Sequence, residues 1–384
     1  MIVGLFWSSL AAVLGTYVLF PAATFVRSLA VPRPYLSGDA GLSVTVVIAA
    51  HNEEASIARK LDSVLASRYG AAMDVVVVTD GCTDATVSVV SAYAHRGVRL
   101  LELPRVGKHG ALNAAVATSR ADVLVFTDAN GELAGDALAQ LVRPFADPEV
   151  GGVAGDQRYR DGGADDGVAD GERSYWSFDR RLKRAESRGG SVVSATGALY
   201  AVRRELFQPV VEGVTDDFYV STGVVAAGRR LVFAEDAVVY EPAASSAAAE
   251  YGRKVRVMTR GLQGVVERRE LLDPRRTGYY AVQLAAHKVL RRLMFVPLGV
   301  MVLTSVLAAR RNPLLRLLAA GQLAGALAGA AGLVLGRTPL RCPRALSLPA
   351  YFCLVNVAAA REVLNVLTGR RIDRWATDRD GTLG

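Results

Sequence analysis

Four apolar runs in the first third of the chain each stop at polar or turn-forming residues. The runs are Ser43–Ala50, Met73–Thr79, Val98–Leu103 and Asp122–Thr127. Each is apolar at successive positions rather than at alternating ones, which is typical of parallel strands that are buried on both faces. Helical patterns separate the runs. Strands that alternate with helices predict a doubly wound, mostly parallel α/β sheet.

The pattern continues less regularly to about residue 245. A further strand is predicted at Val150–Gly155, and the Gly- and Asp-rich stretch Asp156–Gly171 predicts a mobile loop. A charged helix is expected at Glu172–Arg188. Two short strands, Arg230–Ala234 and Ala237–Tyr240, are expected to close the domain.

Longer apolar runs flank this domain. Ile2–Val26 carries no charge and is long enough to cross a bilayer. A signal peptide is the alternative, and we disfavour it because the run lacks a basic n-region and exceeds a typical h-region. Arg27 and Arg33 follow, which places this end in the cytoplasm by the positive-inside rule. Three more apolar runs lie near the C-terminus: Leu293–Ala309, Leu314–Gly336 and Ala345–Leu367.

A basic amphipathic stretch joins the domain to these last runs. Apolar residues recur at helical spacing between about residues 247 and 271, and six Arg and Lys residues lie among them. This pattern predicts a helix on the membrane surface, with an ordinary surface helix as the alternative. The chain is therefore expected to comprise a transmembrane helix (1–27), an α/β domain (42–245), amphipathic interface helices (246–292), C-terminal transmembrane helices (293–369) and a tail (370–384).

The number of C-terminal spans stays open. Three such spans with a cytoplasmic domain would place the basic tail outside, against the positive-inside rule. The last run also contains Arg361 and Glu362, which are costly in lipid without partners. A tilted, re-entrant or interfacial last helix is an alternative to a full span.

Composition and charge agree with a membrane setting. Hydrophobic residues make up 51% of the 384 residues, the mean hydropathy is +0.24 and the formal net charge is +8. A basic chain with apolar spans fits an anionic membrane surface, and no basic run interleaved with aromatics argues for nucleic acid. Three cysteines without metal-ligand spacing are consistent with a reducing cytosol.

Polar side chains follow three of the predicted strands where each strand ends. They are His51 to Glu53, Asp80, and Asp128 with Asn130. In open α/β sheets ligands bind at this edge, and oxygen ligands suit a hard divalent cation that could hold a diphosphate. The structural alternatives are Asx turns and helix caps.

Six short motifs stand in the chain in a recognisable order. They are VTVVIAAHNEE (44–54), VVVVTDGCTDAT (75–86), GKHGALNAA (107–115), VLVFTDANG (123–131), VVSATGALYAVRREL (192–206) and TDDF (215–218). Together they resemble the membrane-bound family 2 glycosyltransferases related to cellulose and hyaluronan synthases. The resemblance implies the GT-A fold, a single nucleotide-binding α/β domain.

The resemblance also implies roles for individual residues. Asp128 would hold a metal–diphosphate as the first carboxylate of a DxD motif, with Asn130 as the second metal ligand and Mg²⁺ or Mn²⁺ as the cation. Lys108 would lie near the diphosphate. The other residues expected at the donor are Ala50, His51, Asn52, Glu53 and Asp80, where Asp80 would accept from the base or ribose or, alternatively, cap the following helix.

The acceptor side is expected around two further motifs. Asp217 matches the last residue of the family's TED motif and would act as the general base. Asp216 would orient Asp217, and capping of the next helix is the alternative for both. Small residues at Thr196, Gly197 and Ala198 would let a sugar approach the backbone.

Two departures from the family pattern bear on function. Asn130 replaces the second carboxylate of DxD, which weakens the expected metal site. No QxxRW motif follows the TDDF motif; at the corresponding position, Arg253 or Lys254 could supply positive charge to the donor, but no Trp is present. The sequence therefore favours transfer of a single sugar over processive elongation.

These observations lead to a functional hypothesis. The chain is expected to be an inverting, metal-dependent glycosyltransferase of the cell membrane, with a cytoplasmic catalytic domain. It would move a sugar from a nucleotide diphosphate, UDP-linked by expectation, to a glycan or lipid-linked acceptor. Its expected partners are membrane lipids, further copies of the chain or an export protein. Nucleic acid is not an expected partner. The alternatives are a polyprenyl-phosphate monoglycosyltransferase and a catalytically silent GT-A scaffold.

Overall fold

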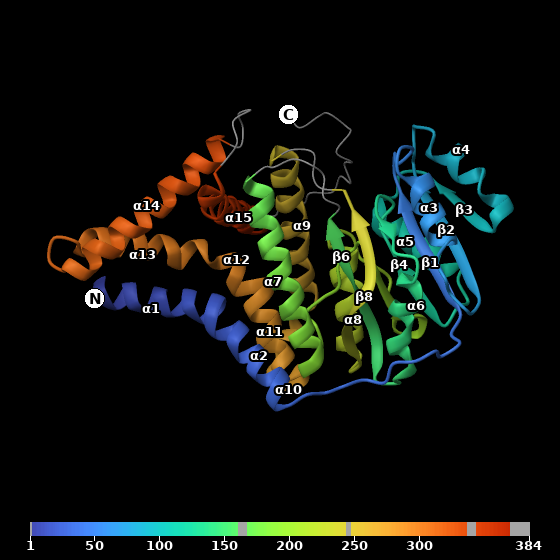
Figure 1. Ribbon diagram of the computed structural model, residues 1–384, viewed down its shortest axis with the longest axis horizontal. Coiled ribbons are helices and arrows are strands. Elements are labelled where there is room, and N and C mark those ends of the chain that lie inside the picture. Colours follow the sequence, from blue (N-terminus) through green and yellow to red (C-terminus); the bar gives the residue numbers. More distant parts are fainter. Residues whose placement is uncertain (1, 160–166, 243–246, 336–342, 369–384) are drawn as a thin grey trace.

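A computed structural model describes residues 2–159, 167–242, 247–335 and 343–368. An α/β domain occupies one end of the molecule, and a group of apolar helices extends from the other (Figure 1). Two long helices stand between these parts. The loop predicted at 156–171 is wrong at both ends, because a strand continues to Tyr159 and a helix begins at Gly167. Residues 160–166, the middle of that prediction, lie outside the described residues.

One mixed sheet of eight strands runs through the α/β domain in the order β3-β2-β1-β4-β7-β6-β8-β5. Parallel pairs join β1 to β2 and β4, β2 to β3, and β6 to β8. Strand β7 pairs antiparallel with β4 and β6, and β5 pairs antiparallel with β8. The strands are β1 (Val44–Ala50), β2 (Met73–Asp80), β3 (Val98–Leu103), β4 (Val123–Phe126), β5 (Glu132–Leu133), β6 (Val150–Tyr159), β7 (Tyr200–Arg203) and β8 (Arg230–Glu241). The predicted mostly parallel α/β sheet is confirmed.

Burial on both faces explains why the central strands are apolar at successive positions. Val46 and Ile48 of β1 pack into one hydrophobic core, and Val47 and Ala49 pack into a second core on the other face. Helices α3 (Ile57–Leu65), α4 (Thr86–Ser91) and α6 (Ala137–Val142) supply the first core. Helices α5 (Gly107–Ala117) and α8 (Asp216–Ala226) supply the second.

The last strand differs from its prediction. The sequence predicted two short strands, but β8 is one strand of 12 residues that pairs with β6 along its length. The pairing register shifts between Ala154 and Asp156, which accounts for the break in the apolar pattern of β8. The two-residue strand β5 was missed because two residues carry no periodicity.

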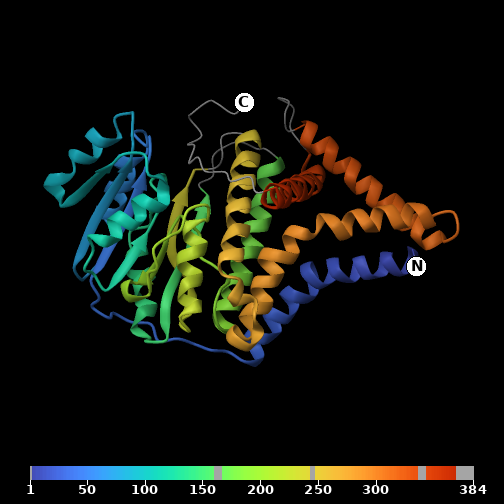
Figure 2. The same ribbon diagram turned by 180° about the vertical axis from the view of Figure 1, so that it is seen from behind.

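Two long helices separate the sheet from the apolar helices. They are α7 (Gly167–Gly189) and α9 (Ala247–Glu267). The N-terminal helix α2 (Phe20–Ala30) packs on α7, and the last helix α15 (Arg344–Leu367) packs on both α7 and α9. The amphipathic stretch that the sequence placed at the membrane surface therefore lies between the α/β domain and the apolar helices (Figure 2).

The remaining helices come from both ends of the chain, and the longer ones are apolar. They are α1 (Ile2–Leu14), which a π-helical stretch (Gly15–Leu19) joins to α2, then α10 (Pro274–Thr277), α11 (Tyr279–Leu284), a second π-helical stretch (Ala285–Leu290), α12 (Arg291–Leu293), α13 (Phe295–Ala308) and α14 (Pro313–Leu335). Short 3-10 turns elsewhere span Ala94–Arg96, Arg143–Ala146, Arg204–Leu206 and Arg269–Leu272.

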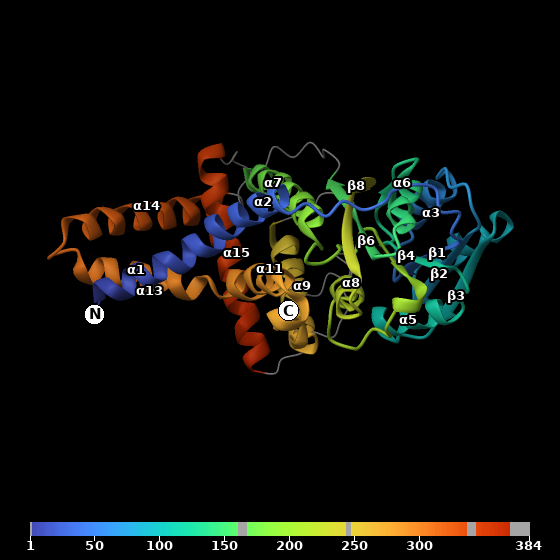
Figure 3. The same ribbon diagram turned by 90° about the horizontal axis from the view of Figure 1, so that it is seen from below.

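Within the described ranges, two helical stretches are long and apolar enough to cross a bilayer, Ile2–Ala30 and Pro313–Leu335. A third span requires Tyr279–Leu293 and Phe295–Ala308 to count as one, and these two are bent by 50°. Helix α13 alone has 14 residues, fewer than a straight span needs. Figure 3 shows α15 crossing the other apolar helices rather than running along them.

The acidic residue of α15 has a partner that the sequence did not indicate. Glu362 is fully buried, and its Oε1 lies 3.1 Å from Nη1 of Arg292 in α12. This ion pair joins two apolar segments that are 70 residues apart in sequence (362 minus 292). It supplies the compensation that a buried carboxylate requires.

Candidate active site

The predicted site residues gather at one edge of the sheet. Strands β1, β2 and β4 are parallel neighbours, so their carboxyl ends meet there. Ala50 ends β1, Asp80 ends β2 and Asp128 lies two residues after β4. The loops that follow β1 and β2 are tied together, since Asn52 Oδ1 accepts from the Thr83 amide at 2.9 Å.

Lys108 connects the donor and acceptor motifs. It is the second residue of α5, and its Nζ lies 2.8 Å from Oδ1 of Asp128 and 3.1 Å from Oδ1 of Asp216. Burial works against the charged form of Lys108, but the two carboxylates outweigh it and raise the pKa of this lysine above its ordinary value. Three motifs that are separate in sequence thus share one charged cluster.

Asp217 lies next to this cluster at the start of α8. Its Oδ1 accepts from the Phe218 amide at 2.8 Å. Burial and the neighbouring Asp216 raise the pKa of Asp217 above its ordinary value, while Lys288 and Lys108 oppose the shift. A carboxylate with a raised pKa is a stronger base at neutral pH, which suits proton removal from a hydroxyl.

Asp216 is held from a second side. The hydroxyl of Tyr200 lies 3.4 Å from Asp216 Oδ2, and Tyr200 is fully buried in the sheet. Thr215 precedes α8, but its side chain makes no capping hydrogen bond within the described part of the chain. The orienting role predicted for Asp216 is therefore compatible with its contacts to Lys108 and Tyr200.

Asp80 has a structural role within the described residues. Its side chain is fully buried, and Oδ1 accepts from the amides of Val106 and Gly107 at 2.6 and 2.9 Å. These bonds cap the start of α5 rather than the following helix α4, and a contact of Asp80 with the donor stays a prediction. Nε of Arg105 lies 3.7 Å from Asp80 Oδ2. Asp80 thereby fixes the loop that presents Lys108.

His51 and Glu53 support the same loops. Nδ1 of His51 lies 2.7 Å from the carbonyl oxygen of Asp80, so the buried imidazole forms a hydrogen bond with the backbone. The Glu53 amide donates to Thr86 Oγ1 at 2.8 Å, and Ser56 donates to the Glu53 carboxylate at 2.5 Å. These contacts place the HNE turn beside β2, as the sequence predicted, and its contact with a nucleoside stays a prediction.

The small-residue motif lies against Asp128. A Cβ built on Gly197 would be 3.1 Å from Asp128 Oδ2, which is closer than most side-chain contacts allow. The carbonyl of Ala198 accepts from Thr127 Oγ1 at 2.6 Å. Thr196 precedes these two residues. The absence of a side chain at Gly197 therefore leaves one oxygen of Asp128 accessible.

The sequence analysis missed Lys60, which lies below the cluster. This lysine of α3 is fully buried, and its Nζ donates to Thr127 Oγ1 at 2.5 Å. Burial lowers the pKa of Lys60 to about 8, against nearby carboxylates of which Asp128 contributes most. The signal was a lysine on the apolar face of α3, at the helical spacing set by Ile57 and Val64.

A cleft opens beside the cluster. Its volume is about 440 Å³, within the range of small-molecule sites, and Lys108 and Asp216 line it. Arg105 and Arg260 also line it, and the sequence analysis had singled out neither as a site residue. Arg260 comes from α9, the helix in which the sequence placed donor contacts at Arg253 and Lys254. The side chains of those two residues fall outside what the structure describes.

The donor set of this cluster can be tested against a divalent cation. Asp128 offers the oxygen that faces Gly197, and oxygen ligands suit Mg²⁺ or Mn²⁺. Asn130 is exposed, and no group of three His, Cys, Asp or Glu able to hold a metal occurs in the described residues. A cation at Asp128 would therefore take most of its coordinating oxygens from a bound diphosphate rather than from the protein.

Comparison with known proteins identifies the class. Residues 45–210 match the family model of glycosyl transferase family 2. An N-acetylglucosaminyltransferase of Rhizobium meliloti (strain 1021) is 28% identical over 214 residues, which are 51% of this chain and 50% of that protein. A poly-beta-1,6-N-acetyl-D-glucosamine synthase of Staphylococcus aureus (strain COL) is 25% identical over 210 residues, 52% of this chain and 50% of that protein.

A solved structure shares the fold over nearly the whole chain. It is the mannosyltransferase PcManGT from Pyrobaculum calidifontis in complex with GDP-Man and Mn²⁺, with a TM-score of 0.72 and 23% identity over 96% of this chain and 100% of that one. The present chain thus carries a family 2 glycosyltransferase domain with the GT-A fold, and the resemblance seen in the sequence is confirmed. It spans about half the length of the curated relatives named above.

Proposed function

We propose that this protein is an inverting, metal-dependent glycosyltransferase of the cytoplasmic membrane face. It would use a UDP-sugar and a polysaccharide or lipid-linked acceptor. The observation that carries the proposal is the cluster in which Lys108 contacts both Asp128 of the donor motif and Asp216 of the acceptor motif. The apolar stretches Ile2–Ala30 and Pro313–Leu335 support the membrane setting.

Each residue has a role in the proposed reaction. Asp128 would hold a divalent cation, which would neutralise charge on the diphosphate. Lys108 lies beside Asp128 and contributes its positive charge to the diphosphate oxygens. Arg105 and Arg260 line the same cleft and add positive charge for the leaving group.

The chemical step follows from the position of Asp217. An acceptor oxygen forms a bond to the anomeric carbon while the bond from that carbon to the diphosphate breaks. The acceptor proton passes to the Asp217 carboxylate, and the nucleotide diphosphate leaves with the electron pair. A single displacement of this kind inverts the configuration at the anomeric carbon.

A screen of radiolabelled nucleotide sugars on membranes that contain the protein tests this proposal. UDP-N-acetylglucosamine is the first donor to test, because the names of the two curated relatives support it. GDP-mannose is the comparison donor, since the structural neighbour was solved with GDP-Man. Sizing the products distinguishes single transfer from elongation. Absence of transfer from every donor, in membranes that contain folded protein, would contradict the proposal.

A second candidate is transfer of one sugar to a polyprenyl phosphate. Lys288 favours it, because it brings a positive charge to the start of α8, which suits an anionic phosphate acceptor. Its Nζ lies 5.5 Å from the ring centre of Phe218, and its charge acts on Asp217. An ionised phosphate acceptor needs no general base. Asp217→Asn separates the two candidates: transfer to a hydroxyl acceptor is lost, whereas transfer to a lipid phosphate persists. Asp136→Asn, an exposed aspartate before α6, is the matched control.

A further inference from the structure

A second cavity lies at the opposite end of the sheet from the active site. Strands β6 and β8 begin there, at Val150 and Arg230, whereas the active site lies where β1, β2 and β4 end. The cavity has a volume of about 410 Å³ and is bounded by the end of α2, the end of α7 and the start of α11. We call it the arginine pocket, because five of its lining residues are Arg27, Arg33, Arg229, Arg230 and Arg276.

The charge of the arginine pocket is unbalanced. Among the described residues that line it, Glu149 is the only acidic one, and its Oε2 lies 3.2 Å from Nη2 of Arg33. Asp273 reaches Arg276 from outside the lining at 4.0 Å. Arg229 donates to the carbonyl of Pro148 at 2.9 Å, a contact that leaves its charge in place.

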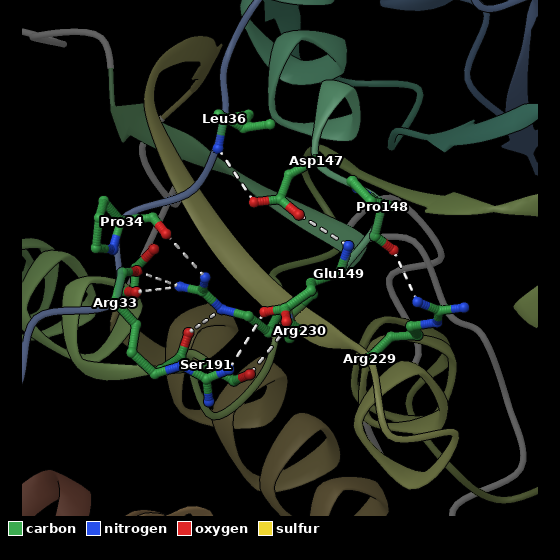
Figure 4. A network of polar contacts seen from close by, with 12 residues as sticks. Arg33, Pro34, Leu36, Asp147, Pro148, Glu149, Ser191, Arg229 and Arg230 are labelled. Carbon is green, nitrogen blue, oxygen red and sulfur yellow. Dashed lines mark hydrogen bonds and ion pairs between the residues drawn. The ribbon is translucent and has the colours of Figure 1, made fainter.

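Arg230 forms the floor of the pocket and is held by backbone. It is 6% exposed, and its guanidinium donates to the carbonyls of Arg33 and Pro34 at 2.7 and 3.3 Å, as Figure 4 shows. Two more bonds reach the carbonyls of Ser187 and Gly190. Burial and the charge of Arg33 lower the pKa of Arg230 below its ordinary value. Carbonyl partners fix this side chain without neutralising it.

Arg27 is the arginine of the pocket that belongs to helix α2. Its guanidinium carbon lies 4.8 Å from the ring centre of Tyr279, and the Tyr279 hydroxyl lies 3.0 Å from Thr24 Oγ1. Among the described residues, the buried Nε of Arg27 has no hydrogen-bond partner. Arginine and tyrosine at the ends of apolar helices are typical of the headgroup layer of a bilayer.

We propose that the arginine pocket binds the phosphate of an anionic phospholipid headgroup. One guanidinium group can bind two phosphate oxygens at once, and several guanidinium groups around one cavity suit a phosphodiester. Arg27 lies in the last turn of α2, near the end of the apolar stretch Ile2–Ala30, so the headgroup of a neighbouring lipid can reach the pocket while its acyl chains stay beside α1 and α2. The chemistry rests on the pocket alone, and the lipid as source rests on the membrane anchoring proposed above.

Native mass spectrometry of the full chain in detergent tests this site. The protein is titrated with phosphatidylglycerol, with phosphatidylcholine and, separately, with inorganic phosphate. The test variant is Arg27→Gln/Arg276→Gln. The matched control is Arg269→Gln/Arg275→Gln, which removes the same charge from exposed arginines of the same region that do not line the pocket. Thermal unfolding without lipid shows whether each variant is folded.

The expected result is preferential binding of phosphatidylglycerol over phosphatidylcholine by the wild type and the control. The test variant should bind phosphatidylglycerol about tenfold or more weakly, because each arginine contributes to attraction of an anionic headgroup. Equal binding of the two lipids, or equal losses in both variants, would overturn the proposal. Arg27-dependent binding of inorganic phosphate without lipid selectivity would instead assign the pocket to a soluble anion. No sugar transfer is measured, so a failed donor screen leaves this test unaffected.

Discussion

Replacing the buried lysine of α3 tests the electrostatics beneath the active site. Lys60 is fully buried, and its pKa falls from 10.5 to about 8 in the folded protein. That difference corresponds to about 3 kcal/mol by which the charged side chain destabilises the fold at neutral pH. Methionine has a similar length and no charge, so Lys60→Met removes this cost. It also removes the hydrogen bond to Thr127, worth about 1 kcal/mol.

The net expectation is a gain of about 2 kcal/mol in unfolding free energy at neutral pH. The gain should shrink at higher pH for the following reason. The unfolded chain keeps the Lys60 proton up to its ordinary pKa, whereas the folded protein releases it from about pH 8. Wild-type stability therefore rises between these two values, and the variant lacks that rise.

Unfolding of the purified protein in detergent, followed at about pH 7 and about pH 10, measures both effects. Arg59→Met is the control, because Arg59 lies next to Lys60 on α3 but its side chain is 67% exposed. The control should stay within about 0.5 kcal/mol of the wild type. A loss of stability in Lys60→Met at neutral pH, or a gain that does not depend on pH, would refute the reasoning.

Three further substitutions probe other parts of the account. Gly197→Ala places a methyl group 3.1 Å from Asp128 Oδ2 and should weaken Mn²⁺-dependent UDP binding about tenfold in calorimetry, a loss of about 1.4 kcal/mol. Arg292→Met leaves the buried Glu362 without its partner and should lower stability by about 3–5 kcal/mol, which a second change, Glu362→Met, largely restores. Asp217→Asn should stabilise the fold at neutral pH, where the wild type holds a carboxylate of raised pKa in its charged form, and each unit of that shift is worth about 1.4 kcal/mol. Unfolding scans across acidic and neutral pH check this.

Each of these three has its own contradicting result. Gly135→Ala is the control for the glycine substitution, since a Cβ there meets nothing within 4 Å, and equal UDP affinities in both variants would show that Gly197 does not limit access to Asp128. A double variant no more stable than Arg292→Met would mean that the ion pair does not account for the loss. For Asp217→Asn, a stability gain that persists below the ordinary aspartate pKa would exclude titration as its cause.

Much of the fold could be predicted from local pattern. Successive apolar residues in β1 and β4 reflect burial on both faces, and each strand ends where its polar residues begin. The same logic placed Asp128 and Asp80 at one edge of the sheet. The meeting of Asp128 with Asp216 was expected only through the order of the motifs, and Lys108 proves to be the residue that joins them.

The missed features depend on contacts between distant residues. Asp80 binds the amides of Val106 and Gly107, so its cap on α5 has no signature in the residues next to it. Arg230 was taken as the start of a strand, and only the folded chain brings the carbonyl of Arg33 to it. The bend of 50° between Tyr279–Leu293 and Phe295–Ala308 likewise has no signature in the hydropathy of these residues.

The central claim is that Asp128 and Asp217 serve different steps at the charged cluster around Lys108, and calorimetry paired with a transfer assay tests it most directly. UDP is titrated into wild type, Asp128→Asn and Asp217→Asn in the presence of Mn²⁺, and sugar transfer to a hydroxyl acceptor is measured on the same preparations. The account predicts that Asp128→Asn loses UDP binding, whereas Asp217→Asn binds UDP as the wild type does but transfers at least about a hundredfold more slowly. Wild-type UDP affinity in Asp128→Asn, or wild-type transfer in Asp217→Asn, would contradict it.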